Sequence, residues 1–446
     1  MFIFAIIVNM INKILGTTGT RMLNAAFNLL ILIVLTRKLG SVGFGTISLI
    51  ILAITILQLF IDLLAGSGII YYTSRKPIPQ LLFPAYGWIL ISASLYALIV
   101  WTVGQYFPEM LNMVIPEGFE LHVLFLSILN ALMLLHYNLL IGQTRIKRYN
   151  SIFVIQISVL LVSVILRFYL QNDNSVHAFI YSLYLSYGFG AFLSFAAISK
   201  YVKSINMHGW LHTSKAVFRY GFISQIANLL HIGNKRFSFY ILRYFSGLPA
   251  VGIYGAGVQL TEGLRLIGQS ISLVQFSSIA GQADTRYAVN LTVRLMKLSF
   301  IITLLALIIL LIIPSDVYVT IFKKDFGDIK VLILALSPGL LALSINTIFS
   351  GYFAGVGRPK VSMIVNAIGF VVTLFAAGLI IPLYGYIGAA VAASLSYSTT
   401  VLAQYIIFKK ETKTCLKDWL ITKQDWFEMK NIVHILLKTN KLRNNE

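Results

Sequence analysis

The chain has 446 residues, of which 58% are hydrophobic and only 11% are charged, and its formal net charge is +20. Soluble domains carry about 25% charged residues, so this composition excludes a soluble enzyme, a collagen-like chain and a disordered chain. It indicates a polytopic membrane protein. A single cysteine, Cys415, excludes a disulfide framework and a multi-cysteine metal site.

Apolar stretches of helical length recur along the chain, separated by Pro, Gly and clusters of Lys and Arg. Their length predicts an all-α protein with about twelve membrane-spanning helices, and the lack of strict alternation argues against strands. The predicted spans are 15–36, 44–72, 80–106, 119–142, 149–170, 176–199, 216–243, 249–279, 290–313, 329–356, 361–381 and 386–408.

Lys and Arg concentrate in alternate loops and in the tail after residue 408, whereas the loop at 107–120 holds three Glu and no basic residue. Because cytoplasmic loops of membrane proteins are enriched in basic residues, this distribution predicts that both termini are cytoplasmic. The first ten residues are apolar but lack a basic segment and a cleavage site, which favours an uncleaved lead-in over a signal peptide.

Two short sequence echoes favour a pair of six-span halves around a central cavity, although stretches this short can also match by chance. Residues 39–45 resemble 248–254, and residues 142–147 resemble 355–360. Such parallel repeats place a transporter's cavity at the repeat interface. The predicted parts are an N-terminal lobe at 1–200, a cytoplasmic linker at 201–215, a C-terminal lobe at 216–409 and a cytoplasmic tail at 410–446. The tail is either an amphipathic helix on the membrane or a solvated extension.

No catalytic constellation is present, and the chain lacks a Gly-x-x-x-x-Gly-Lys-Ser/Thr phosphate loop. The seven histidines are scattered; for His136 and His231, which fall in spans, a hydrogen-bonded packing role is favoured over a proton relay. The large loops of a membrane glycosyltransferase are also missing. We therefore expect a transporter that is not an enzyme and has no cofactor or resident metal.

Ionisable residues inside the predicted spans are the sharpest functional signal. A charge at the centre of a spanning helix costs about 2.5–3.5 kcal/mol on insertion scales, so such residues normally face a wet cavity or a partner. The candidate substrate-binding residues are basic: Arg21, Lys235, Arg236 and Arg265. The candidates for ion coupling are acidic: Asp62 and Glu262. Because these residues come from both halves, they predict a central cavity of net positive charge that suits an anionic cargo.

A structural interpretation stays open for each of these residues. Glu262 and Arg265 are three residues apart, so they can pair along one helix face and merely fix its packing. Neighbouring positions on a helix point about 100° apart, so Lys235 and Arg236 cannot both face one point; an early end of their span would leave both in water.

The remaining two intramembrane charges also have structural interpretations that involve no cargo. Arg21 lies among the lipid headgroups if its span begins near Met22, and Asp62 is an alternative case of a carboxyl group capped inside the bundle instead of exposed to cargo.

Five stretches, taken with their order and spacing, give a family resemblance: 35–45, 68–75, 250–254, 355–360 and 381–390. Over about residues 12–409 the chain resembles the Wzx-type polysaccharide flippases of the MOP (multidrug/oligosaccharidyl-lipid/polysaccharide) exporter superfamily. The resemblance implies a twelve-helix, two-lobed protein of the bacterial inner membrane that works by alternating access. Such proteins carry undecaprenyl-diphosphate-linked oligosaccharide units, for example of the O-antigen of lipopolysaccharide, to the periplasmic leaflet. The family often has an acidic residue in the seventh span, where this chain reads Gly-Asn-Lys-Arg at 233–236.

The main hypothesis is therefore a flippase in which Lys235, Arg236 and Arg265 hold the diphosphate of a lipid-linked oligosaccharide. The partners expected are this polyprenyl-diphosphate-linked cargo and membrane lipids, with a polysaccharide polymerase and glycosyltransferases as further candidates, and no nucleic acid. The alternative is a cation-coupled multidrug or metabolite exporter of the same superfamily, against which the basic surplus argues. A non-transporting scaffold or a membrane transferase has less support.

Overall fold

The computed structural model describes residues 2–73, 75–202, 209–280, 285–358 and 360–414. The side chains of residues 2–22 and of ten residues between 223 and 280 lie outside this description. Most of the predicted tail, from residue 415, lies outside it as well. The described part is almost entirely helical and contains no strand, which confirms the predicted fold class.

Within these described ranges twelve helices follow one another, with one π-helical turn, η1, and one 3₁₀ turn, η2. In order they are α1 (Phe2–Ala65), α2 (Ser67–Thr73), α3 (Ile78–Tyr106), α4 (Pro108–Val114), α5 (Glu120–Gly142), α6 (Ile146–Ile165), η1 (Leu166–Leu170), α7 (Val176–Val202), α8 (Trp210–Ala280), α9 (Thr285–Ile312), α10 (Ser315–Phe322), η2 (Lys324–Phe326), α11 (Ile329–Gly355) and α12 (Lys360–Thr412).

Three of these helices are twice the length of a span because each contains a single non-helical glycine. The glycines are Gly40 (φ 67°) in α1, Gly247 (φ 77°) in α8 and Gly385 (φ 53°) in α12. A positive φ is easily reached only without a Cβ atom, so glycine turns the chain here without a loop. Each corner divides its helix into two segments, which gives six segments from α1, α8 and α12. Together with α3, α5, α6, α7, α9 and α11, the described part thus has twelve long helical segments, as the sequence predicted.

Eight helical stretches of the described part are long and apolar enough to cross a membrane, and two of them, 23–73 and 360–412, contain a glycine corner. The polar α8 is not among the eight. The short helices α4 and α10 lie between spans, where seven and eight residues are too few to give a periodicity readable from sequence.

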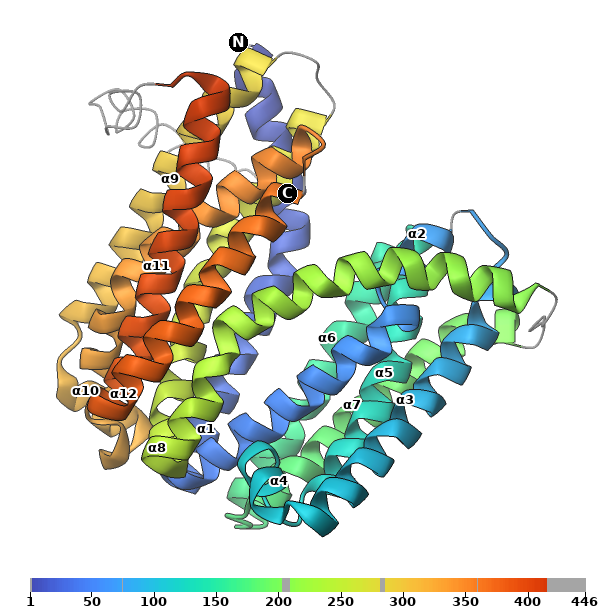
Figure 1. Ribbon diagram of the computed structural model, residues 1–446, viewed down its shortest axis with the longest axis vertical. Helices are drawn as coiled ribbons and strands as arrows, with labels where there is room; N and C mark the ends of the chain where they lie inside the picture. Colours follow the sequence, from blue (N-terminus) through green and yellow to red (C-terminus); the bar gives the residue numbers. More distant parts are fainter. Residues whose placement is uncertain (1, 74, 203–208, 281–284, 359, 415–446) are drawn as a thin grey trace, which may run out of the picture.

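The two ends of the molecule differ in charge and in the form of their connections. We call the end that holds the turns at 75–77, 143–145 and 357–358 the basic end, because Arg75, Lys76, Arg145 and Arg358 lie in them. We call the opposite end, with α4, α10 and the three glycine turns, the corner end. The long helices α1, α8 and α12 turn back there, at the lower side of the view in Figure 1.

The helices form two bundles that meet along α1 and α8 and diverge toward the upper side of the view (Figure 1). At the corner end the two helices touch backbone to backbone. A Cβ atom on Gly45 would lie 2.2 Å from the Leu248 carbonyl oxygen, and one on Gly252 would lie 1.9 Å from the Ser41 carbonyl oxygen. Glycine is therefore required at both positions for the bundles to meet this closely.

The first segment of α8 crosses from one bundle to the other. Its start packs on the N-terminal bundle through aromatic rings, because Trp210 meets Phe83 edge-on at 5.9 Å and Tyr220 stacks on Tyr71 at 4.6 Å between ring centroids. Its later residues pack against α11 and α12 (Figure 1). Part of the expected linker at 201–215 is therefore helix from Trp210, and the limits of the two lobes stay a prediction.

The second sequence echo corresponds to two turns with the same hydrogen bonds. In the turn after α5, Thr144 has a φ of 60° and the Arg145 amide donates to the Leu140 carbonyl at 2.9 Å. In the turn after α11, Gly357 has a φ of 79° and the Arg358 amide donates to the Phe353 carbonyl at 2.7 Å. Thr144 takes the left-handed conformation despite its Cβ, which shows that the hydrogen bonds of the turn outweigh that strain.

Candidate functional site

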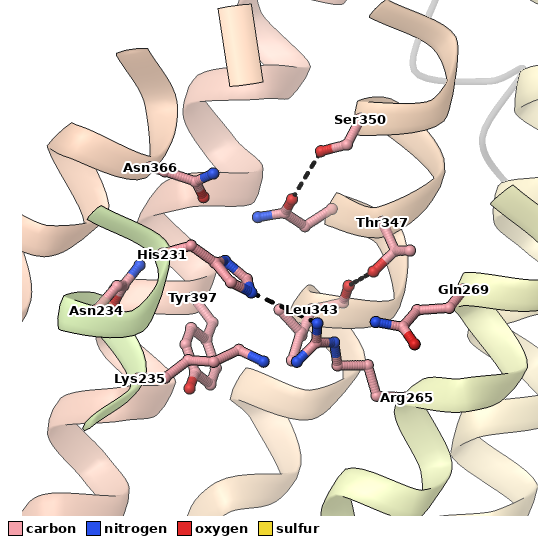
Figure 2. Close-up of a pocket in the computed structure, with 11 residues that line it drawn as sticks. His231, Asn234, Lys235, Arg265, Gln269, Leu343, Thr347, Ser350, Asn366 and Tyr397 are labelled. Carbon is pink, nitrogen blue, oxygen red and sulfur yellow. Dashed lines mark hydrogen bonds between the residues drawn. The ribbon is translucent and has the colours of Figure 1, made fainter. Parts of the chain in front are cut away.

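A polar cavity of about 150 Å³ lies inside the C-terminal bundle (Figure 2). Its lining comes from both segments of α8, from α11 and from both segments of α12. The lining residues are His231, Asn234, Lys235, Arg265, Gln269, Leu343, Asn346, Thr347, Ser350, Asn366 and Tyr397. This cavity lies within one half, and the expected cavity between the two halves stays a prediction.

Helical spacing explains how distant stretches of sequence supply one polar surface. Residues three or four positions apart share a helix face, which is the spacing of His231 to Lys235, of Arg265 to Gln269 and of Asn346 to Ser350. These faces turn toward one another across the bundle, as Figure 2 shows.

The cavity lies deep within the bundle. Lys235 precedes the Gly247 corner by 12 residues and Arg265 follows it by 18 residues. With a rise of 1.5 Å per residue, they lie about 18 and 27 Å from the corner end along their helices. The hydrocarbon core of a membrane is about 30 Å thick, so the cavity falls within the span of the helices instead of at the level of the headgroups.

Arg265 is held in the cavity by neutral groups. Its Nη2 lies 3.4 Å from His231 Nε2, which Figure 2 marks, and a half-turn of the Gln269 amide brings the oxygen of that amide to 2.8 Å from the same nitrogen. Since Nη2 donates to Nε2, the imidazole proton is on Nδ1 in this arrangement. Neither partner neutralises the guanidinium, whose positive charge stays available to a ligand.

Lys235 extends into the same cavity from the first segment of α8, toward Arg265 on the second (Figure 2). No acidic residue occurs among the eleven lining residues, and among the described residues neither cation has a carboxylate within 4.0 Å. Two like charges in a cavity of low dielectric repel each other, and an anion between them removes that cost. The arrangement is therefore suited to bind an anionic group.

Arg236, the neighbour of Lys235, does not line the cavity. Its Nη2 lies 3.0 Å from Glu262 Oε1, and both side chains are about one third exposed. The sequence placed Glu262 beside Arg265, on the same helix face; in the structure Glu262 pairs instead with Arg236, across the two segments of α8. The Gly247 corner causes the difference, because it folds the second segment back along the first.

The Arg236–Glu262 pair gives a prediction about stability that is separate from ligand binding. Reversing one member, in Arg236→Glu or Glu262→Arg, places two like charges about 3 Å apart and should cost about 1–3 kcal/mol. The double reversal, Arg236→Glu with Glu262→Arg, should recover most of that loss. Thermal unfolding of the purified protein measures all three; a double reversal no more stable than the single variants would show that the pair does not join the segments.

Asn234 lines the cavity and also anchors the first segment of α8 to α12. Its Oδ1 accepts from Thr373 Oγ1 at 2.6 Å and from Ser396 Oγ at 2.5 Å, and all three side chains are buried. Because both hydroxyl groups and the amide oxygen of Asn234 are paired, the register of α8 is fixed one residue away from Lys235.

Asp62 and Glu262 do not line this cavity, and the side chain of Arg21 lies outside the described part. Asp62 lies in the N-terminal bundle, where Gln58 Nε2 donates to its Oδ1 at 2.7 Å and Asn130 Nδ2 donates to Gln58 Oε1 at 3.2 Å. Arg21 belongs to the stretch of α1 whose side chains lie outside the described part. Glu262 is adjacent to the cavity only through its pair with Arg236.

Sequence reasoning missed the uncharged part of the site. It named Lys235 and Arg265, but not the amides and hydroxyls of Gln269, Asn346, Asn366 and Tyr397. A signal was present, because amides are rare in spans and two of these, Gln269 and Asn346, lie on helix faces that carry another lining residue. His231, interpreted as a packing residue, contacts Arg265, whereas His136 is buried between Tyr86 and Ser194.

No protein-family profile matches the chain. Among curated proteins, an uncharacterized membrane protein of Methanocaldococcus jannaschii is 27% identical over 186 residues, which are 40% of this chain and 37% of that protein. The chain therefore matches well under half the length of that relative.

Solved structures match over nearly the whole chain at low sequence identity. A multidrug resistance MATE family transporter of the MOP superfamily, in an inward-facing conformation, has a TM-score of 0.71 at 14% identity, with 86% of this chain and 93% of that chain covered. The lipid II flippase MurJ, in an inward closed conformation, has a TM-score of 0.67 at 14% identity, with 94% and 96% covered.

A third match is a MOP superfamily transporter from Pyrococcus furiosus, described as having a binding pocket of reversed polarity. Its TM-score is 0.55 at 14% identity, with 91% of this chain and 95% of that chain covered. Identities this low speak for the fold, which agrees with the twelve long segments and the two bundles described above. The chain thus has the fold of the MOP superfamily transporters.

Proposed function

We propose that this protein is a flippase that carries an anionic, lipid-linked oligosaccharide across the membrane by alternating access, with undecaprenyl-diphosphate-linked units as its cargo. The observation that carries the proposal is the pair of cations, Lys235 and Arg265, which share a deep cavity that no acidic residue lines. Keeping two charges within the span of the helices is costly, and a phosphate group is the ligand that they bind best.

The roles of the basic residues follow from their contacts. Lys235 and Arg265 bind phosphate oxygens directly, and Arg236 acts as a positioning residue through its pair with Glu262. Arg21 is a further candidate contact to the cargo. A cavity of about 150 Å³ has the volume of about five water molecules, so it takes a phosphate-sized group and not a whole oligosaccharide. The amides and hydroxyls around it suit the adjoining sugar hydroxyls, while the lipid tail stays in the bilayer.

The proposed setting is the bacterial inner membrane, with the basic end and both termini in the cytoplasm. This orientation is supported by the many Lys and Arg at the basic end. Glycosyltransferases that build the cargo and a polymerase that uses it are the proposed partners, on opposite sides of the membrane, in the synthesis of a surface polysaccharide such as O-antigen. The protein itself acts as a transporter, since the similar structures are transporters or flippases and not enzymes.

The direct test is a flipping assay with the purified protein in sealed vesicles. The vesicles contain undecaprenyl-diphosphate-linked oligosaccharide, and a lectin added outside counts the exposed glycans over time. Protein-containing vesicles should expose the inner pool faster than protein-free vesicles do. Two results together would reject the flippase: no faster exposure of the glycans, and efflux of an organic cation in exchange for protons from the same vesicles. They would favour the multidrug exporter that the MATE match also allows.

Asp62 is our proposed coupling residue, because its carboxyl group is enclosed in the N-terminal bundle with Gln58 as a hydrogen-bond partner. Asp62→Asn keeps the size and the hydrogen bond but removes the exchangeable charge. We expect this variant to lose the dependence of flipping on an imposed ion gradient, while flipping down the cargo gradient persists. A variant that still responds fully to proton and sodium gradients would exclude Asp62 from coupling.

A further inference from the structure

The two bundles are joined at the corner end by a carboxylate from one and a helix start from the other. Asp325 lies in η2, between α10 and α11 of the C-terminal bundle. Ser41 begins the second segment of α1, after the Gly40 corner. Asp325 Oδ2 accepts from the Ser41 backbone N–H at 3.1 Å and from Ser41 Oγ at 3.0 Å.

This contact does what an N-cap residue does, but it comes from 284 residues away. The first amides of a helix have no partner within it, and a carboxylate there accepts their hydrogen bonds and interacts favourably with the helix dipole. The residue before Ser41 is Gly40, which has no side chain to offer. A Cβ atom at Gly40 would also lie 3.0 Å from Asp325 Oδ2, so glycine both turns the chain and admits the carboxylate.

The matching corner of α8 has fewer amides to satisfy. There the segment after Gly247 begins with Leu248 and Pro249, and proline has no N–H. The two corners are therefore unequal: the corner of α8 begins with a proline of its own chain, and the corner of α1 is capped by a carboxylate of the other bundle. A capping contact that depends on the relative position of two bundles is a device for holding one conformation.

We propose that Asp325 is a latch that keeps the corner end closed, and that it releases Ser41 when the space between the two bundles opens toward that end. This proposal rests on the alternating access of the proposed function, though not on the identity of the cargo. In the latched state the contacts of Gly45 with Leu248 and of Gly252 with Ser41 close the space between the bundles. Once the hydrogen bonds from Ser41 to Asp325 break, only packing holds the two bundles together here, and they separate at the corner end.

The test measures how fast a reagent reaches the interface from the corner end. Ser48, whose Oγ would lie 2.8 Å from a Cβ on Gly255, is a suitable reporter site between α1 and α8. The full-length protein carries Ser48→Cys and Cys415→Ser, is reconstituted in vesicles with known orientation, and meets a membrane-impermeant thiol reagent from the corner side. We expect Asp325→Ala to raise the labelling rate about five- to tenfold.

Two further variants weaken the latch contact by smaller steps. Ser41→Ala removes one of the two hydrogen bonds and should raise labelling about twofold. Asp325→Asn keeps an acceptor but loses the charge, and should fall between Asp325→Ala and the parent protein. The matched control is Asp328→Ala, which also removes a corner-end carboxylate. Asp328 bonds Tyr386 within the C-terminal bundle, so its loss should leave the rate unchanged.

Equal labelling of the Asp325→Ala and Asp328→Ala proteins, both eluting as folded protein, would overturn the latch. If Asp325→Ala fails to fold, Asp325→Asn and Ser41→Ala still decide, since unchanged labelling in both overturns it too. The assay needs no cargo. Faster labelling in a protein that flips no oligosaccharide would leave the latch standing without the flippase, and unchanged labelling in an active flippase would reject the latch alone.

Discussion

We expect the double variant Lys235→Gln/Arg265→Gln to flip lipid-linked oligosaccharide about a thousandfold more slowly than the parent protein. Removing one partner of a buried charge pair costs about 2 kcal/mol or more, which is about thirtyfold in binding for each residue. Glutamine removes the positive charge and leaves a polar side chain with two N–H donors in place of each cation. The vesicle assay with an external lectin measures the rate, and each single variant should show the thirtyfold step.

The matched control for this experiment is Arg243→Gln. Arg243 lies eight residues after Lys235 on the same segment of α8 and is not among the residues that line the cavity. Its loss removes one positive charge from the same helix without touching the site. Equal rates for Arg243→Gln and Lys235→Gln would mean that the cavity does not bind the cargo's charge.

The second large effect is expected at the crossing of α1 and α8. Gly252→Ala places a methyl group 1.9 Å from the Ser41 carbonyl oxygen, and this neighbour is backbone that cannot rotate away. Overpacking of side chains costs about 1–3 kcal/mol, and the rigid neighbour puts this variant at the upper limit or beyond. We expect a clear drop in thermal stability and, in Gly252→Val, a protein that no longer assembles its two bundles.

Gly263→Ala is the control on the same segment of α8, because a Cβ atom there meets nothing within 4 Å. Alanine is the better helix former, so this variant should be as stable as the parent or about 0.5–1 kcal/mol more stable. Size-exclusion chromatography after heating compares the two. A Gly252→Ala protein as heat-resistant as Gly263→Ala would contradict the close crossing.

The helical layout could be predicted from sequence almost completely, because a span is a long signal that dominates its neighbours. The segments at 78–106, 120–142 and 329–355 agree with the expected spans within about two residues. The sequence did not predict the short helices, such as α4, because its seven residues are too few to give a periodicity. The predicted breaks at 36–44, 243–249 and 381–386 each contain one of the glycine corners, but the sequence did not show that a single glycine makes each turn without a loop.

The site could be predicted only in part, since sequence gives the angle of a residue on its own helix but not the helix that it faces. Lys235 and Arg265 were found because charge in a span is rare. For Glu262 the sequence offered only a possible partner on the same helix, Arg265, because spacing does not show which residue of the preceding segment lies opposite it after the turn at Gly247. The same ignorance of neighbours placed Asp62 with the cations, although it packs in the other bundle.

The corner of α8 has a consequence for how the protein enters the membrane during synthesis. Because one glycine separates two long segments, no separate loop has to cross the bilayer between them, and only the short stretch from Arg243 to Gly247 is carried across as the two segments enter the lipid as one hairpin. The first arm brings Arg236 and the second brings Glu262, so this ion pair forms within the hairpin. The chain thereby offsets part of the insertion penalty of its most polar helix before α9, α11 and α12 have been translated.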